Sequence, residues 1–208
     1  MEDVKVKDFI NDVAAKTASP GAGATAAVTA SMAVATLLMA IKFSDNNTLT
    51  AKNAKMFVLT IEELETVKDD FQNLVKKEEE NFINLMNVFK MPKETLKERR
   101  VREAKVQEGL IKASEVPIQL IHEIRRVQLI VEKIYPLIKP NIVADIGVGL
   151  ELLQAVAHSC SYNVYSNIRF LKNKPKKITM LSSVDKKIAS IDKLNRYMLK
   201  SVKSIINT

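Results

Sequence analysis

One carboxylate interrupts the apolar side of a long predicted helix, "TLTAKNAKMFVLTIEELETVKDDFQNLVKKEEENFINLMNVFK". Phe71, Val75, Glu78, Phe82 and Leu85 follow one another at steps of three and four, which places Glu78 in the middle of a buried helical seam. A buried carboxylate without a partner is costly, so Glu78 must be paired, hydrated, protonated or facing a cavity. Two interpretations stay open: the seam opens to solvent among the charges of "KKEEEN", or Glu78 is a functional carboxylate.

Polar residues interrupt the apolar stripe of a second predicted helix, "NIVADIGVGLELLQAVAHSCSYNVYSNIRFL", at both ends. Asp145 and Asn163 are five turns apart, about 27 Å along the axis, so both cannot contact one reacting atom within a single chain. Asp145, flanked by Gly147 and Gly149, is the better placed for chemistry, and the alternative is a first-turn carboxylate stabilised by the helix dipole. Asn163 and Asn167 are one turn apart and can hydrogen-bond a neighbouring helix or subunit.

The elements that position these side chains are predicted to be helices throughout. Every long segment has helical period, and strand-like alternation is missing, which predicts an all-α bundle of long, mostly antiparallel helices in a single domain over residues 1–208. Pro117 is expected to interrupt one long helix. The basic segment "NKPKK" is predicted to be a break, after which the last helix begins with Ser182 or Ser183 as its N-cap.

A small-residue stretch, "TASPGAGATAAVTASMAVATLLMAIKF", carries no charge before Lys42. It is long enough to span a bilayer, but most of it is Ala, Thr, Ser and Gly, which favours a closely packed core helix beginning around Ala24. The preceding "MEDVKVKDFINDVAAK" is typical of an amphipathic helix, not of a leader peptide. Gly21 and Gly23 permit a tight turn that aims free backbone N–H groups at a ligand carboxylate or carbonyl, and the alternative is a plain Pro-Gly turn.

Composition restricts the classes of partner and cofactor. The single cysteine, Cys160, excludes an internal disulfide or a thiolate metal site, and His122 and His158 have no ligand partner at useful spacing, so we expect no metal and a cytoplasmic protein. The net charge of +8 fits nucleic acid, an anionic membrane surface or a small polyanionic ligand. Aromatic residues make up only 5% of the chain, and the basic residues share helices with acids, which disfavours a nucleic-acid binder.

Several motifs, taken in order, resemble one known family. "SPGAGA", "MPKETLKERRVREAKVQEGL", "SEVPIQLI" and an Asp followed by "NVYSNIRFL" resemble the formiminotetrahydrofolate cyclodeaminase family, which includes the methenyltetrahydrofolate cyclohydrolases, over nearly the whole chain. The chain departs from the family at Ala22, where a third glycine is usual, at Glu78, where Asp is usual, and at Ala144, where Ser is usual. Glu extends the carboxylate by one methylene, and a displacement of about 1 Å can cost about 10²-fold in rate.

The resemblance implies an all-helical folate one-carbon enzyme. In the cyclodeaminase reaction, N10 attacks the formimino carbon on N5 and ammonia leaves, giving 5,10-methenyltetrahydrofolate. The alternatives are a cyclohydrolase, which opens the methenyl ring with water, and a non-catalytic folate-binding helical protein. The expected partners are a tetrahydrofolate derivative as substrate and a second copy of the chain in a homodimer, with no metal or redox cofactor, no nucleic acid and no membrane.

The resemblance also implies a set of site residues. Asp145 and Glu78 are expected to be catalytic and to line one cavity. Arg102 is expected to bind folate carboxylates at a basic rim, and the alternative is a surface ion pair with Glu98 or with the neighbours of Glu103. The expected substrate-binding residues are Pro20, Gly21, Gly23, Arg102, Asn163 and Asn167.

Overall fold

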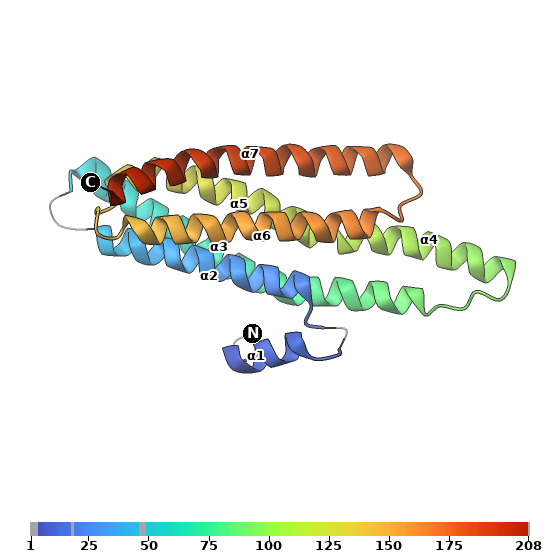
Figure 1. Ribbon diagram of the computed structural model, residues 1–208. Helices are drawn as coiled ribbons and strands as arrows, with labels where there is room; N and C mark the ends of the chain where they lie inside the picture. The colour runs from blue at the N-terminus through green and yellow to red at the C-terminus, as the bar shows by residue number, and fades with distance from the viewer. Residues whose placement is uncertain (1–3, 18, 46–48, 208) are drawn as a thin grey trace.

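The computed structural model describes residues 4–17, 19–45 and 49–207, and every regular element within these ranges is helical (Figure 1). The helices are α1 Val6–Ala14, α2 Ala22–Ser44, α3 Ala51–Phe89, α4 Leu96–Ala113, α5 Glu115–Ile134, the short 3-10 helix η1 Tyr135–Leu137, α6 Val143–Ile168 and α7 Lys174–Ile206. The predicted all-α fold is confirmed.

The long helices form a bundle in which α2 packs against α3 and α6, and α6 packs against α5 and α7. Figure 1 shows α4 continuing the direction of α5, so that the corner between α3 and α4 extends beyond the other helices. One apolar core runs through α2, α3, α5, α6 and α7. The helix α1 lies apart beside α2, and none of its residues is buried. The predicted amphipathic N-terminal helix therefore exists, and it contacts the edge of the core through the partly buried Phe9.

Small side chains let α2 approach its neighbours closely. Ala27, Ala30 and Ala33 are fully buried, and Gly149 of α6 leaves no room for a side chain, because an added Cβ would lie 2.5 Å from the Leu37 Cγ. By length and composition α2 is apolar enough to cross a membrane, but 61% of its most apolar 18-residue window is buried inside the bundle. This burial supports the interpretation of α2 as a packed core helix.

The break between α4 and α5 comes three residues before Pro117. Proline has no backbone N–H, so the Ala113 carbonyl four residues earlier loses its usual helical donor. The Asn167 Nδ2 of α6 donates to that carbonyl at 3.1 Å, and the Asn81 Nδ2 of α3 donates to the Lys112 carbonyl at 3.2 Å. Two asparagines thus hold the break in place, and one of them is a residue that the sequence singled out.

The start of the last helix differs from the prediction. The helix α7 begins at Lys174, eight residues before Ser182, because the Asn173 side chain accepts a hydrogen bond from the Lys176 backbone N–H at 3.0 Å and a proline lies in the first turn. The segment "NKPKK" therefore initiates the helix instead of breaking the chain. The apolar side of α7 is buried at Val184, Ile191, Leu194, Met198 and Val202.

Candidate active site

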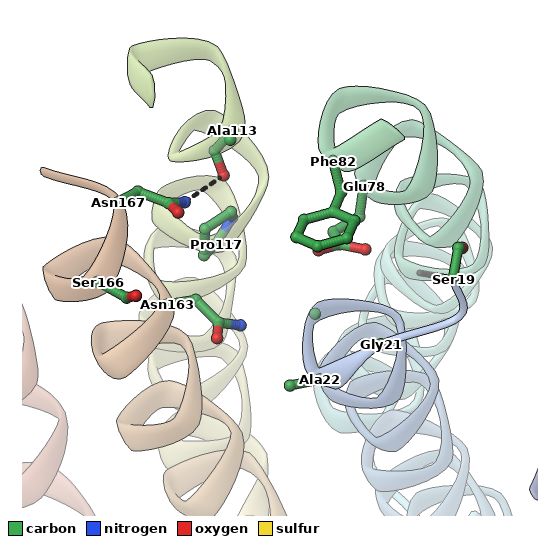
Figure 2. Close-up of a pocket in the computed structure, with 11 residues that line it drawn as sticks. Ser19, Gly21, Ala22, Glu78, Phe82, Ala113, Pro117, Asn163, Ser166 and Asn167 are labelled. Atoms are coloured by element: carbon green, nitrogen blue, oxygen red, sulfur yellow. Dashed lines mark hydrogen bonds between the residues drawn. The ribbon is translucent and has the colours of Figure 1, made fainter. Parts of the chain in front are cut away.

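A cavity of about 290 Å³ lies where the beginning of α2, the middle of α3, the α4–α5 break and the C-terminal part of α6 meet (Figure 2). Four of the predicted substrate-binding residues and one of the two predicted catalytic carboxylates line it. The lining residues are Ser19, Gly21, Ala22, Gly23, Glu78, Phe82, Ala113, Pro117, Asn163, Ser166 and Asn167.

Glu78 reaches from α3 to the beginning of α2. The first turn of a helix has backbone N–H groups without helical partners, and Gly21, at the N-cap, has no side chain to accept from them. The Ala24 backbone N–H instead hydrogen-bonds the Glu78 carboxyl. Glu78 is half-buried, so the seam around it opens into the cavity and not fully to solvent.

The environment of Glu78 favours the protonated acid. Burial raises the pKa of the Glu78 carboxyl above its ordinary value of 4.5, and the negative charge of Glu79 raises it further. The hydrogen bond from Ala24 lowers the pKa and partly offsets these effects. A carboxyl whose pKa is raised in this way can both give and accept a proton nearer to neutral pH.

The opposite wall of the cavity is α6, which contributes two amides. Asn167 is engaged by the Ala113 carbonyl, so its predicted role as a bond to a neighbouring helix is confirmed. The Asn163 side chain points into the cavity, and within the described residues it has no hydrogen-bond partner (Figure 2). Asn163 therefore offers both a free donor and a free acceptor to a ligand that lies across from Glu78.

Apolar residues that the sequence did not single out complete the cavity. Phe82 follows Glu78 by one turn of α3 and lines the same cavity (Figure 2). Pro117 faces it from α5. The sequence contained a signal for both residues. Phe82 lies on the same apolar seam as Glu78, and Pro117 leaves without a helical donor the carbonyl to which Asn167 donates. An apolar wall beside a carboxyl excludes water and maintains the raised pKa.

Asp145 does not join this cavity, so the prediction that it shares one cavity with Glu78 is wrong. Asp145 lies in the first turn of α6, about 27 Å along the helix from Asn163, which lines the cavity. Asp145 and Asn163 share a face of α6, but they lie at different positions along its axis and so cannot reach the same cavity. The glycines beside Asp145 have a packing role, because an added Cβ at Gly147 would lie 3.2 Å from the Val202 Cγ1 of α7.

Arg102 also lies away from the cavity. Its Nη2 donates to the Phe89 carbonyl at 3.1 Å, at the last turn of α3, and it stands about 16 Å along α4 from the lining residue Ala113. Arg102 is therefore no part of a rim at this cavity. Within the described ranges Arg102 forms no ion pair with the alternative partners either: the Glu98 carboxyl accepts from the Thr95 backbone N–H at 2.8 Å, and Glu103 pairs with Lys172 at 2.8 Å.

The Pro-Gly turn contributes differently from the prediction. Ser19 and Gly21 line the cavity, whereas Pro20 between them does not. Gly21 has an extended backbone with φ of −121°, and no glycine in the described ranges has a positive φ, so the turn does not require the conformational freedom of glycine. Gly23 is required for space, since an added Cβ would lie 1.9 Å from the Glu78 Oε1.

The single cysteine lies behind the cavity wall on α6. Burial, together with the negative charge of Glu78, raises the pKa of the Cys160 thiol to about 12. Cys160 is fully buried and its thiol stays protonated at neutral pH, so it does not act as a nucleophile. His158 hydrogen-bonds Asp192 of α7 at 2.8 Å and belongs to the contact between α6 and α7.

These features define a class of site: a small-molecule pocket in a helical bundle, with one carboxyl suited to proton transfer and a free amide facing it. The sequence model of the formiminotransferase-cyclodeaminase family matches residues 5–186. The chain therefore belongs to the formiminotransferase-cyclodeaminase family, as its motifs indicated.

Individual relatives fall into two groups. A methenyltetrahydrofolate cyclohydrolase from Methylorubrum extorquens is 25% identical over 202 residues, which is 97% of each chain. A formimidoyltransferase-cyclodeaminase from Gallus gallus is 26% identical over 161 residues, but the match covers only 30% of that longer protein. The crystal structure of formiminotetrahydrofolate cyclodeaminase from Thermotoga maritima superimposes with a TM-score of 0.88 over 99% of this chain at 23% identity, which shows the shared fold.

Proposed function

We propose that this protein is a folate one-carbon enzyme whose reaction takes place in the cavity between Glu78 and Asn163. The observation that carries the proposal is the half-buried Glu78 carboxyl, which has a raised pKa and faces a free amide across a cavity. Family membership supplies the substrate class, a tetrahydrofolate derivative. A cavity of about 290 Å³ suits the reacting end of a folate, with the glutamate tail outside.

The leading reaction is formiminotetrahydrofolate cyclodeamination. With the formimino nitrogen protonated, N10 attacks the formimino carbon, which leaves a positive charge on N10 and a neutral amine on the carbon. The Glu78 carboxylate takes the N10 proton and delivers it to that amine, so the carbon–nitrogen bond breaks and neutral ammonia leaves. The 5,10-methenyl cation remains, and charge and atoms balance without any further reactant.

The second candidate is methenyltetrahydrofolate cyclohydrolase, favoured by the relative whose match spans 97% of both chains. Here water attacks the methenyl carbon and Glu78 accepts one of its protons. Glu78 delivers this proton to N5 as the carbon–N5 bond breaks, and the remaining hydroxyl proton is released to solvent, which leaves the formyl group on N10. The same carboxyl serves both reactions, because each requires a proton to be moved between two atoms bonded to one carbon.

Two departures from the family meet in the cavity. Glu78 stands where Asp is usual, and the Ala22 methyl points into the space that a third glycine would leave open (Figure 2). A longer carboxylate and a narrower cavity both change the position of a bound ring. We expect Glu78→Asp to retain or improve turnover, and an activity loss in this variant would mean that the rest of the cavity has adapted to Glu.

Steady-state assays of the purified protein with both substrates test the proposed function. Ammonia release from 5-formiminotetrahydrofolate identifies the cyclodeaminase, and loss of the methenyl absorbance with water as nucleophile identifies the cyclohydrolase. Tight folate binding with no turnover of either substrate would contradict both and would support a non-catalytic folate-binding protein.

We also propose the homodimer that the family resemblance implies, although not for the reason drawn from the sequence. Asn167 finds its partner within the chain, so it needs no second subunit. The outer face of α2 instead exposes Met32, Met39 and Phe43 at 50%, 41% and 64%, at helical spacing. Sedimentation should show a dimer at working concentration, and a stable monomer would contradict the proposal.

A further inference from the structure

The Glu78 carboxyl occupies space that belongs to the side chain of almost any residue at position 23. A Cβ added to Gly23 would lie 1.9 Å from the Glu78 Oε1, 2.3 Å from its Cδ and 2.8 Å from its Cγ. All three distances are far below van der Waals contact, and all three involve one side chain. The three atoms nearest to this Cβ position all belong to Glu78. The end of the Glu78 side chain therefore fills the space that a side chain at position 23 would need.

The same space gives Glu78 its hydrogen bond. Gly23 is the second residue of α2, and the next residue, Ala24, supplies the backbone N–H that hydrogen-bonds the carboxyl. This N–H is one of those that the first turn of a helix leaves without a helical partner. A methyl at position 23 would overlap the carboxyl in the position from which it hydrogen-bonds this N–H.

We propose that Gly23 is a positioning residue for Glu78: the missing side chain at position 23 is what allows the carboxyl to reach Ala24 and to face the cavity. This inference rests on the proposed function, and it changes the role expected for Gly23 from binding substrate to placing the proton-transfer group. The methyl of an alanine would displace the end of a flexible side chain and not the backbone, so the helix itself accepts Gly23→Ala.

A double-mutant cycle tests the inference. Because a displacement of about 1 Å can cost about 10²-fold, we expect Gly23→Ala to lower kcat at least 10-fold, with KM changed much less. Glu78→Asp withdraws the carboxyl from position 23, so adding Gly23→Ala to that variant should lower kcat by less than about 3-fold, well short of additivity. Equal losses in the two backgrounds would overturn the inference.

Gly109→Ala is the matched control. It places the same substitution in α4, outside the active-site cavity, where the added Cβ would lie 3.0 Å from the Leu85 Cδ1 at the end of a side chain and 3.9 Å, an ordinary contact distance, from the Leu85 Cα. We expect wild-type kcat in Gly109→Ala. If both glycine variants lose activity in proportion to their free energy of unfolding, Gly23 acts through stability and the positioning role is wrong.

A second readout separates this inference from the proposed function, because it needs no turnover. In the wild type, the NMR shift of the Ala24 amide should follow the titration of Glu78, and in Gly23→Ala it should not. A wild type without activity towards either folate would overturn the proposed function while leaving this result interpretable. An Ala24 amide that titrates identically in both proteins would overturn the role of Gly23.

Discussion

At its C-terminal part, α6 presents Asn163 to a cavity, whereas at its N-terminal end the same helical face packs through Gly149 against α2, with Gly147 on the opposite face against α7. Both ends carry polar residues on an apolar stripe, and both looked suited to chemistry. The difference is that α2 begins at the Asn163 end, where its unpaired N–H groups and Glu78 meet. A polar residue on a buried face indicates function only where several elements end together and leave a space.

The largest effect on stability is expected at the packed end. An added Cβ at Gly149 would lie 2.5 Å from the Leu37 Cγ and 3.2 Å from the Ala33 carbonyl oxygen, which is rigid backbone. Overpacking of this kind costs about 1–3 kcal/mol, so we expect Gly149→Ala to lower the free energy of unfolding by about 2 kcal/mol in urea titrations. Turnover of the folded protein should remain near wild type. A loss of turnover without a loss of stability would place chemistry at the Asp145 end.

A smaller effect, on substrate binding, is expected at the C-terminal part of α6, which lines the cavity. Asn163→Ala removes the free amide that faces the ligand, so KM should rise about 10-fold, close to the value of one hydrogen bond, while the free energy of unfolding stays nearly constant. Asn167→Ala provides the contrast: it strands the Ala113 carbonyl and should lower the free energy of unfolding by about 1–2 kcal/mol. Unchanged KM in Asn163→Ala would remove this residue from the site.

The smallest effect is expected for Arg102, which lies outside the cavity. Arg102→Ala removes one hydrogen bond to the Phe89 carbonyl and should lower the free energy of unfolding by about 1 kcal/mol or less. The KM for a polyglutamylated folate and its dependence on salt should match those of the exposed control Arg100→Ala. A higher KM with a flatter salt dependence, in Arg102→Ala alone, would restore the basic rim predicted from the sequence.

Helical period predicted the fold because it depends only on local spacing and burial. The apolar seam of α3 placed Glu78 correctly, and the interruption at Pro117 anticipated the α4–α5 break. The start of α7 was missed, because the Asn173 cap and the following proline look like a loop when read as composition alone. Local sequence signals therefore predicted which segments are helices. The error at α7 arose because Asn and Pro are typical both of a turn and of the first residues of a helix.

The site was only partly predictable, because it depends on how far neighbouring helices are shifted along one another. The sequence of each helix does not fix this shift. Glu78, Gly21, Gly23, Asn163 and Asn167 meet at one cavity only because α3, α2 and α6 pack with a particular offset. Helical period fixes the face on which Asp145 lies but not the level at which another helix crosses it. The reason for Gly23 was likewise hidden, since its constraint is a carboxyl 55 positions away in the chain.

Comparing Glu78→Gln with Asp145→Asn tests the central claim most directly. An amide cannot move a proton, so Glu78→Gln should lower kcat by about 10²–10⁴-fold, while Asp145→Asn stays within about 3-fold of wild type. The wild-type pH–rate profile should also show a limb above pH 4.5, the ordinary carboxyl value, because burial raises the pKa of Glu78, and this limb should be missing in Glu78→Gln.

The same raised pKa fixes the sign of the effect on stability. The folded protein binds the Glu78 proton more tightly than the unfolded chain does, so wild type should lose free energy of unfolding, relative to Glu78→Gln, as the pH rises from 4.5 through the folded-state pKa. The account predicts this loss together with the collapse of kcat in Glu78→Gln. Full activity in Glu78→Gln, or a collapse in Asp145→Asn instead, would contradict it.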